Sequence, residues 1–567
     1  MDKKTNNGFN IKTKEPRVAY FSMEIAIQNE IPTYSGGLGV LAGDTLRSAA
    51  DMEVPMVGIT LLSRKGYFSQ SFDENFMQTE SPIKWEVDKY LEPLQVRVTV
   101  PIEGRQVKLG VWRYYIEGVS GYKLPVYFLD ANIQGNNPSD IQLTDYLYGG
   151  DIAYRLKQEI ILGIGGVRLL DALGYNSILK YHMNEGHAAL LTLQLLKNEN
   201  GDHEAVTKKC VFTTHTPVPA GHDRFPRALV EKTLEGFITS EEAALIFPNG
   251  ELNMTFLGLR FSEYINGVTK KHGEISRSMF PGYPISSITN GVHTLFWTSD
   301  PFRRLYDKYL DGWRSDPFML RYVSSIPPAE IHEAHQESKR RLIDRINAIT
   351  NAGFEYDTFT IGFARRATAY KRATLLFNNI ERLEKIAEKH GKIQLVFAGK
   401  AHPRDDEGKR GIQKIMKLLN KFSGNIKGVY LVNYDMELAG LMTSGVDVWL
   451  NTPKRPHEAS GTSGMKASIN GVPHFSTLDG WWLEGHIEDA TGWSIGPKET
   501  AKDITPEELE EQDAKDLYDK LEKSILPKYY GNKEEWKRIM QYSIFINASF
   551  FNTHRMVRQY VTSAYFD

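Results

Sequence analysis

The second half of the chain alternates apolar, β-type runs with charged turns, beginning with FTIGFARRATAYKR at residues 359–372. The pattern recurs in QLVFAGKAHP (394–403), VYLVNYDMEL (429–438) and VDVWLNTPKRPHEASGTSGMK (446–466). Helical periodicity fills the gaps, at residues 372–388, 407–421 and 436–443. Strands and helices that alternate at this pitch predict βαβ units and a parallel sheet.

Each charged turn directly follows a predicted strand, and ligands of open parallel sheets bind beyond the carboxyl ends of the strands. Arg365, Arg366, Lys371 and Arg372 place four cations within eight residues of such an end. A run of charge is usually a solvated face. Guanidinium groups at a strand end can also bind oxyanions in bidentate fashion, and a lysine adds a point charge. Two phosphate groups would account for four cations better than one.

The segment EASGTSGMK at residues 458–466 combines small residues, a predicted helix start and a lysine one turn later. Backbone amides at such a turn can form a nest for a phosphate group. Lys466 could hold that phosphate by charge, or carry an aldehyde cofactor as a Schiff base. A helix cap followed by a surface lysine is the alternative. The P-loop pattern GxxxxGK[ST] is absent from the sequence.

The first half is richer in short β-type runs, at residues 18–22, 56–62, 96–101, 107–116 and 126–129. Residues 96–116 alternate as in a hairpin, and residues 147–173 have helical periodicity. Two further strands, at 178–183 and 210–214, end in histidine-containing turns. We therefore expect that His187 and His215 could line a cleft. The alternative is that each is a buried structural histidine.

Two glycine-containing segments remain ambiguous. YSGGLGVLAGD (34–44) contains G-x-G-x-x-A, but it follows no clear strand, and the next predicted strand ends without an acid for a ribose. A glycine loop that lets backbone amides approach an anion or a sugar explains it better. The aromatic residues of GWW (480–482) are either a sugar platform or core.

Composition excludes several classes of protein. The 567 residues carry 68 Lys+Arg and 70 Asp+Glu, a net charge of −2, which argues against a nucleic-acid partner. The single cysteine, Cys210, excludes an intramolecular disulfide and a Cys-rich zinc site. HEAH at 332–335 is interpreted as surface, so we expect no metal. Without a signal-like or 18-residue apolar run, we expect a cytoplasmic protein with no membrane contact.

In the motifs described above, the sequence resembles the α-glucan (glycogen, starch and maltodextrin) phosphorylase family, and most of all its short bacterial and archaeal branch. The resemblance covers residues 18–492. The motifs that carry it occur in family order: YSGGLGVLAGD, RLKQE (155–159), NEGH, THTPVPAGHDRFP, ITNGVH, ARRATAYKR, FAGKAHP, NYDMEL and EASGTSGMK.

The resemblance implies an α/β fold of two Rossmann-like domains that face a deep cleft, the GT-B glycosyltransferase type. We assign residues 1–295 to the glucan and phosphate side. Residues 296–567 then form the side that binds pyridoxal phosphate, with the tail after residue 532 packing back on the first domain.

The family motifs also imply roles for individual residues. Lys466 would carry pyridoxal 5′-phosphate as a Schiff base, and Thr462, Ser463 and Arg365 would hold the cofactor phosphate. Inorganic phosphate would be held by Arg366, Lys371, Gly36 and Gly37. The glucosyl unit would be held by Glu458, Ser460, Gly461, Asn290 and His215, with Tyr370 and Tyr434 lining its pocket. Of these, the catalytic set is Lys371, Arg366, His215 and Glu458.

The implied activity is reversible, retaining phosphorolysis of α-1,4-glucan non-reducing ends by inorganic phosphate, which gives α-D-glucose 1-phosphate. The sequence has no match to the N-terminal regulatory segment of the animal enzymes, so we expect no allosteric activation by AMP. Three alternatives remain: a sugar-nucleotide-dependent glucosyltransferase of the same fold, a pyridoxal aminotransferase and an inactive glucan-binding protein. A homodimer is left open.

Overall fold

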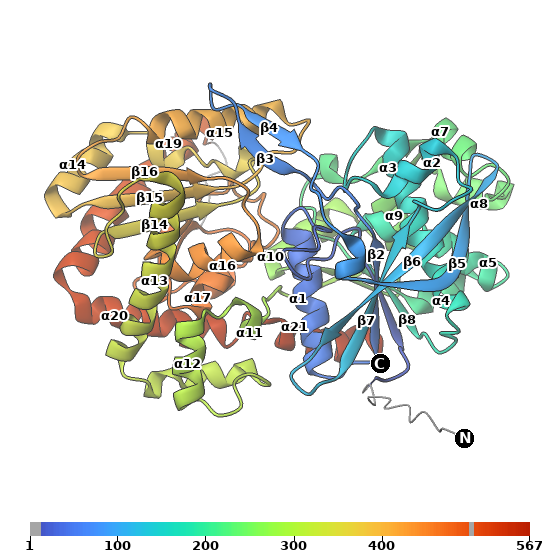
Figure 1. Cartoon of the computed structure of the whole chain (residues 1–567), viewed down its shortest axis with the longest axis horizontal. Coiled ribbons are helices and arrows are strands. Elements are labelled where there is room, and N and C mark those ends of the chain that lie inside the picture. Colours follow the sequence, from blue (N-terminus) through green and yellow to red (C-terminus); the bar gives the residue numbers. More distant parts are fainter. Residues whose placement is uncertain (1–12, 498–503, 567) are drawn as a thin grey trace, which may run out of the picture.

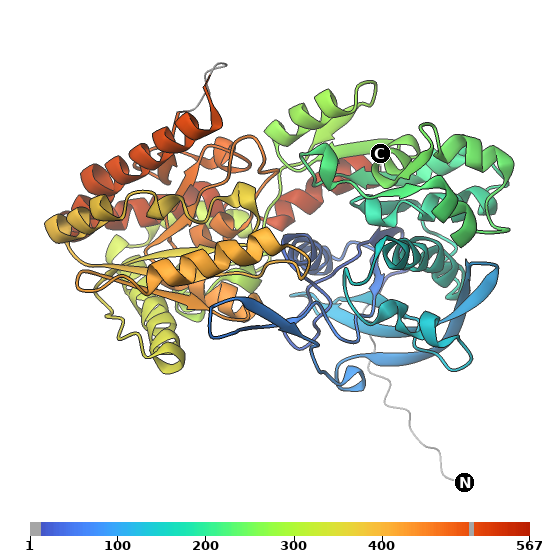
Figure 2. The same ribbon diagram turned by 90° about the horizontal axis from the view of Figure 1, so that it is seen from above.

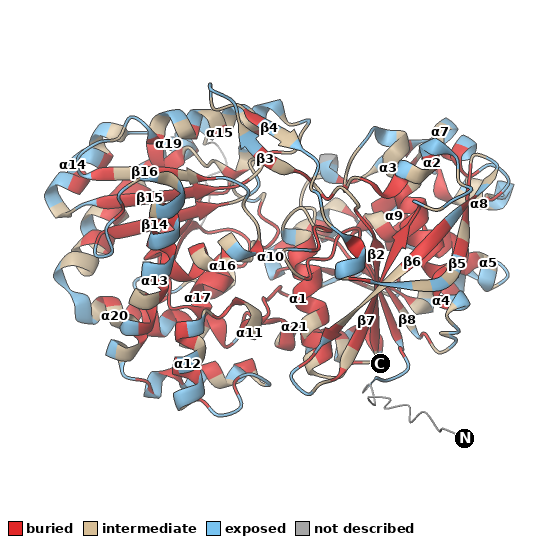
Figure 3. Cartoon of the chain, in the orientation of Figure 1, coloured by how far each residue is buried: buried red, intermediate tan, exposed pale blue. Residues whose placement is uncertain are grey.

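The chain builds two separate β-sheets, each accompanied by helices (Figure 1). The computed structural model describes residues 13–497 and 504–566. Figure 3 shows that the central strands of both sheets are buried, whereas the edge hairpin of the first sheet and the outer faces of the surrounding helices are partly exposed. Within the described ranges, no helix combines the length and apolar character needed to cross a membrane.

The first sheet contains nine strands of the described chain, in the order β13-β12-β9-β8-β1-β2-β7-β6-β5. Seven strands pair in parallel, and β5 and β6 form an antiparallel hairpin at one edge, as the sequence predicts. β1 and β2 are buried at every position, which is typical of parallel strands covered on both faces. The strands are β1 (Val18–Phe21), β2 (Met56–Leu61), β5 (Glu92–Ile102), β6 (Arg105–Glu117), β7 (Lys123–Asp130), β8 (Lys180–Asn184), β9 (Cys210–Thr213), β12 (Tyr264–Gly267) and β13 (Ile285–Ser287).

The helix expected from residue 147 begins only at Ile152. Tyr148 and Gly150 have positive φ angles of 56° and 66°, and the side chain of Asp151 caps the helix by accepting from Tyr154 N at 2.8 Å. Residues 147–151 therefore form a loop. The helices of this half are α1 (Gly37–Asp51), α2 (Pro138–Ile141), α3 (Ile152–Ile160), α4 (Gly166–Ala172), α5 (Leu191–Asn198), α6 (His203–Lys209), α7 (Arg227–Thr233), α8 (Ser240–Ile246), α9 (Met254–Arg260) and α10 (Lys270–Met279).

The second sheet is fully parallel across its six described strands, in the order β16-β15-β14-β17-β18-β19. The four strands predicted from sequence are present, and β18 and β19 extend the sheet beyond them. The strands are β14 (Phe359–Ala364), β15 (Ile393–Ala398), β16 (Ile426–Leu431), β17 (Val448–Asn451), β18 (His474–Thr477) and β19 (Gly492–Ile495). Two small hairpins lie outside both sheets: β3 (Ser69–Phe72) with β4 (Gln78–Ser81), and β10 (Arg224–Pro226) with β11 (Glu251–Asn253).

The helix predicted at 372–388 starts late, at Ile380. Arg372 has a left-handed φ of 45°, and its guanidinium donates to Thr452 O at 3.0 Å and pairs with Asp513 at 2.7 Å. The helices after residue 293 are α11 (Thr294–Trp297), α12 (Asp300–Tyr309), α13 (Pro328–Thr350), α14 (Ile380–His390), α15 (Asp406–Leu419), α16 (Met436–Gly445), α17 (Ser463–Ile469), α18 (Trp482–Gly485), α19 (Pro506–Lys520), α20 (Lys533–Tyr542) and α21 (Thr553–Tyr560).

Burial decides two ambiguous segments. Trp481 and Trp482 are 1% and 0% exposed, so they belong to the core and cannot serve as a sugar platform. The interpretation of HEAH as surface is wrong for His335, which is 1% exposed and contacts Asp447.

The chain crosses between its two halves at Val292 and returns at Asn552, where the two segments form a parallel β-bridge. Figures 1 and 2 place the C-terminal end beside the first half, where α21 packs on α1. Next to the crossing, His293 Nε2 lies 2.8 Å from Asp51, and His554 lies 3.4 Å from the same oxygen. Because His293 Nδ1 accepts from Phe296 N, its Nε2 carries the proton and donates to Asp51. A hydrogen bond therefore joins His293 to Asp51 in this cluster.

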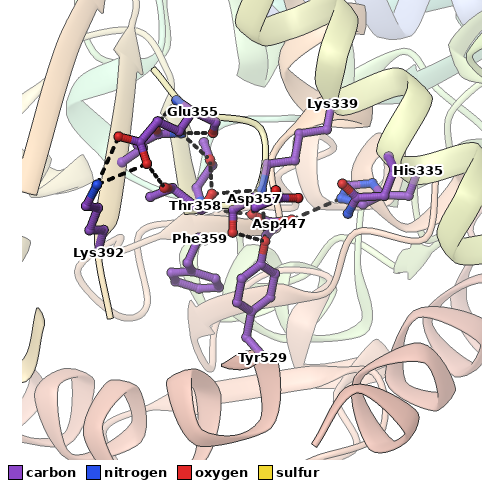
Figure 4. A network of polar contacts seen from close by, with 12 residues as sticks. His335, Lys339, Glu355, Asp357, Thr358, Phe359, Lys392, Asp447 and Tyr529 are labelled. Carbon is purple, nitrogen blue, oxygen red and sulfur yellow. Dashed lines mark hydrogen bonds and ion pairs between the residues drawn. The ribbon is translucent and has the colours of Figure 1, made fainter. Parts of the chain in front are cut away.

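A buried ion pair joins helix α13 to the amino ends of β14 and β17 (Figure 4). Lys339 Nζ lies 2.6 Å from Asp447 Oδ2, and both side chains are 0% exposed. The ammonium group also donates to Thr358 O at 2.8 Å and to Tyr529 Oη at 2.9 Å. Burial alone would raise the pKa of Asp447, but Lys339 holds that pKa below its usual value. The pair therefore fixes α13 against the sheet.

Lys339→Met should lower the free energy of unfolding by about 3–5 kcal/mol, because it leaves a buried carboxylate without its cation. Lys392→Met is the control from the same view, since Lys392 and Glu355 pair at about half exposure. We expect that change to cost less than about 1 kcal/mol. Urea unfolding of the two variants measures the difference, and equal losses would contradict the assignment.

Candidate active site

The candidate site in the second half lies where the strand order of the sheet reverses. The chain proceeds from β14 to β15 and β16 on one side, then to β17, β18 and β19 on the other. Arg365 follows β14, Asn451 ends β17, and the Arg365 guanidinium donates to the Asn451 side chain. Open α/β sheets bind ligands at such a switch point, beyond the carboxyl ends of the strands.

A buried carboxylate gathers two of the predicted cations. Lys371 Nζ lies 2.8 Å from Glu458 Oε2, and Arg365 pairs with the same oxygen. The three side chains are 7–9% exposed. Burial would raise the pKa of Glu458, but Arg365 and Lys371 together lower it to about 2. Glu458 is therefore an anion, and the three charges sum to +1.

Arg366 differs from its neighbour Arg365 because it is exposed. Among the described residues, no carboxylate lies within salt-bridge distance of its guanidinium. Arg366 is thus the cation of this loop that is free to meet an incoming anion. Lys371, by contrast, has its Nζ 4.4 Å from the centroid of the Tyr370 ring.

Lys466 lies in helix α17, and its side chain is buried. Its ammonium is 3.7 Å from the centroid of the Trp297 ring, and the Trp297 indole donates to Asp44 at 2.7 Å. Burial lowers the pKa of Lys466 to about 8. A buried lysine with a lowered pKa is suited to react with a carbonyl compound. The reading of Lys466 as a surface lysine is therefore wrong.

The glycine loop ends at the amino terminus of helix α1, which has no side-chain cap. An added Cβ at Gly36 or Gly37 would meet nothing within 4 Å, so the space in front of the terminus is open. Gly36 N donates to the buried carboxylate of Glu24 at 3.2 Å. The amides available to an anion here therefore begin at Gly37.

His215 and Asn290 come from loops of the first half. His215 Nε2 lies 2.6 Å from Asn184 Oδ1, and Asn184 Nδ2 donates to Ser22. Asn184 Oδ1 is therefore an acceptor, which puts the His215 proton on Nε2. Burial lowers the pKa of His215 to about 3, so the ring is neutral. Asn290 Oδ1 is buried and has no hydrogen-bond partner among the described residues.

The remaining predicted residues follow β16 and β17. Gly461 has a φ of 70°, and Ser460 Oγ donates to Gly461 O at 3.3 Å. Thr462 precedes α17 without a side-chain cap bond, and Ser463 Oγ accepts from the Trp449 indole at 2.9 Å. Tyr434 is half-buried in the loop after β16.

Loops of the two sheets meet at this site. Thr269 Oγ1 of the first half donates to Ala459 O at 2.8 Å, next to Glu458. Asp44 of helix α1 and Lys466 of α17 both contact Trp297. The structure therefore brings α1, which starts with the glycine loop, and the cation-bearing loops into one region.

Three acidic residues of this region were missed by sequence reasoning. Glu24 accepts from the backbone of Ser35 and Gly36 and from Tyr148 Oη at 2.9 Å. Asp479 accepts from Glu458 N at 2.9 Å, and burial raises its pKa to about 7. Asp44 accepts from Trp297. Their position in the sequence could have identified two of them, because Glu24 and Asp479 each follow the end of a strand by two or three residues.

Comparison with known proteins identifies the family of this chain. The family model for carbohydrate phosphorylases matches residues 222–495. Maltodextrin phosphorylase of Thermococcus litoralis is 40% identical to this chain, over 98% of the chain and 71% of that protein. The chain belongs to the carbohydrate phosphorylase family. Glycogen phosphorylases of Mycobacterium tuberculosis and Aquifex aeolicus are each 34% identical to it over 97% of the chain, and the matches cover 70% and 86% of those proteins. The resemblance seen in the sequence is thereby confirmed.

Gly37→Ala should leave the fold intact but weaken anion binding at α1, because its methyl group enters the open space before the helix amides. We expect phosphate to bind at least about 10-fold more weakly, with a Tm within about 2 °C of wild type. Gly39→Ala is the matched contrast, since its Cβ would lie 2.7 Å from Glu24 Oε2 and should destabilise the protein. Calorimetric titration with phosphate tests this, and unchanged affinity in Gly37→Ala would contradict it.

Proposed function

We propose that this protein is an α-glucan phosphorylase. It cleaves α-1,4-glucans at their non-reducing ends with inorganic phosphate and gives α-D-glucose 1-phosphate with retention, in a reversible reaction. The observation that carries the proposal is the loop at the end of β14. There Arg365 and Lys371 both form ion pairs with Glu458, and Arg366 has no carboxylate partner among the described residues. The names of the maltodextrin and glycogen phosphorylase relatives support the same activity.

We also propose that the chain divides at residue 295/296 into two Rossmann-like domains that face a cleft, as in GT-B glycosyltransferases. Support comes from the two mainly parallel sheets and from the chain crossing at Val292. The hydrogen bond from Thr269 to Ala459 joins the two domains at the site.

The residues around Lys466 fit pyridoxal 5′-phosphate. The amine is buried, lies against Trp297 and has no hydrogen-bond partner among the described residues, so an aldehyde would meet an unengaged group. Lys466 would hold the cofactor, and Thr462, Ser463 and Arg365 would hold its phosphate. When bound, that phosphate supplies a proton donor and acceptor beside inorganic phosphate.

The cations of the β14 loop have an electrostatic task in this reaction. Two neighbouring phosphate dianions repel each other strongly at low dielectric. Arg365, Arg366 and Lys371 offset this repulsion, and each can supply about 2–4 kcal/mol of transition-state stabilisation. Inorganic phosphate can then give a proton to the 4-oxygen of the departing, shortened glucan, and attack the anomeric carbon of the glucosyl unit from the same face as that oxygen leaves. Gly37 would bind phosphate from the opposite side through its amide.

The glucosyl unit would be held by Glu458 and by several neutral groups. His215 offers Nδ1 as an acceptor, since its proton is directed to Asn184. Asn290 Oδ1 is a buried acceptor without a partner in the described chain, and a sugar hydroxyl would satisfy it. Ser460, Gly461, Tyr370 and Tyr434 complete the proposed pocket. A sugar-nucleotide glucosyltransferase would use the cations equally well but would leave the buried Lys466 without a role.

Lys371→Ala and Arg366→Ala should each raise the KM for phosphate and slow the chemical step. The expected loss is about 10²–10³-fold, as for removing one oxyanion donor. Initial rates at varied phosphate and fixed maltoheptaose measure it. Arg404→Ala is the control, because Arg404 lies after the next strand end and has no place in the proposed site. An unchanged phosphate KM in both site variants argues against phosphate binding at this loop.

Covalent attachment of pyridoxal phosphate to the apoprotein should depend on pH with a midpoint near 8. The neutral amine is the reacting form, and burial lowers the pKa of Lys466 to about 8 from the value of about 10.4 for an exposed lysine. Attachment should therefore increase as pH rises through 8 and then level off. Absorbance before and after borohydride reduction follows it, with Lys466→Ala as the blank. A midpoint near 10, or attachment in Lys466→Ala, would falsify the assignment.

A further inference from the structure

A hairpin of the first half reaches across to the second sheet. This arm, residues 68–81, carries β3 and β4, and both views place it beside helix α15 (Figures 1 and 2). Its contacts concentrate on the turn that follows β15, residues 399–401. Two glutamines of the arm, Gln70 and Gln78, are only 2% and 3% exposed.

Gln78 pairs with Ala401 as if its side chain were a neighbouring strand. Its Nε2 donates to Ala401 O at 2.9 Å, and its Oε1 accepts from Ala401 N at 3.0 Å. The same amide also donates to Glu80 at 2.6 Å and accepts from Gln70 at 2.9 Å. Every hydrogen-bonding position of the Gln78 amide is thereby used.

Gln70 bonds to the same turn and to one further loop of the second sheet. Its Nε2 donates to Gly399 O at 2.9 Å. Its backbone N donates to Asn433 Oδ1 at 2.6 Å, and Asn433 N donates back to Gln70 Oε1 at 3.0 Å. Asn433 has a left-handed φ of 58° and directly precedes Tyr434 of the proposed glucosyl pocket. The arm therefore holds the loops after both β15 and β16.

The turn that the arm holds, residues 399–401, is itself hydrogen-bonded to the cation loop, the segment after β14 that carries Arg365 and Arg366. Ala367 N donates to Lys400 O at 3.0 Å, and Arg365 N donates to Ala398 O at 3.2 Å. A Cβ on Gly399 would lie 1.9 Å from Arg365 O, so the two backbones are in direct contact. Lys400 Nζ donates to Phe68 O of the arm at 3.0 Å. Movement of the arm would therefore shift the loop that carries Arg365 and Arg366.

We propose that the arm is a positioning device for the phosphate site: it stays docked during turnover, and Gln70 and Gln78 set the position of the cation loop from the opposite half of the chain. The inference rests on the proposed function for the identity of the anion. Undocking would remove the arm's hydrogen bonds to Ala401 and Asn433 together, and would leave Gly399 O bonded to Tyr430 Oη alone. Two further bonds add to the docking, one at the tip from Gln413 to Asn75 O at 2.9 Å and one in β4 from Lys409 to Glu80 at 2.8 Å.

The first test replaces the buried amide. Gln78→Glu puts a carboxylate oxygen against Ala401 O, and Gln78→Met removes both bonds to Ala401 at similar size. Both should raise the phosphate KM about 10-fold or more, because buried partners are left unpaired. The glucan KM should stay within about twofold. Thr79→Val is the control, since Thr79 is an exposed residue of the same hairpin that bonds to Ser71. An unchanged phosphate KM in folded Gln78→Met overturns the proposal.

Hydrogen exchange separates this proposal from the proposed function. In the wild-type protein the amides of Ala401 and Asn433 should exchange slowly, and in Gln78→Met the exchange of Ala401 should accelerate about 10-fold or more. A wild-type protein without phosphorolysis would refute the proposed function. Rapid exchange of Ala401 in the wild type would refute docking of the arm.

The second test locks the arm. Asn75→Cys and Gln413→Cys place thiols at the tip contact, and a short bismaleimide joins them. The native Cys210 is buried and does not compete. The cross-linked enzyme should keep at least about half of the activity of the unlinked double variant, because the arm does not leave during turnover. A loss of about 10-fold or more on cross-linking alone would show that release of the arm is required.

Discussion

The buried carboxylate of Glu458 is the constraint on which the site depends. It follows β17, which pairs with β14 where the strand order of the sheet reverses, and it gives Arg365 and Lys371 a common partner. Without it, two cations would face each other at low dielectric and repel. With it, the loop is formed before any ligand binds and still carries a positive charge. Preorganised charge of this kind acts without reorganisation during the reaction.

Much of the second sheet could be predicted because β14, β15 and β17 are continuous apolar runs followed by polar turns. β18 (HFST) and β19 (GWSI) were missed because four residues with serine, threonine and glycine give no clear period. The hairpin β3–β4 was missed for another reason. Its buried residues Gln70 and Gln78 are polar, so the pattern of hydrophobic residues could not indicate that this segment is buried against the second sheet.

The motifs located most of the site, and long-range contacts completed it. Lys371, Arg365 and Glu458 meet although 87 residues separate Lys371 from Glu458. Sequence alone could not assign Gly36, whose amide is taken by Glu24, because that bond depends on how the chain folds back after β1. It also could not decide between platform and core for Trp482, since an aromatic pair looks the same in either setting. Burial supplied the answer in the structure.

The return of α21 to the first half has a consequence for biosynthesis. His182 Nδ1 bonds to Tyr565 at 2.6 Å across 383 residues, and Thr213 and Asn266 bond to Tyr560. These buried polar groups of the first sheet have no such partner until the ribosome has reached residue 565. At about 5–20 residues per second, roughly 20–80 s separate the synthesis of His182 from that of Tyr565. The nascent first half must therefore wait, with part of its core uncovered, for a helix encoded near the other end of the sequence.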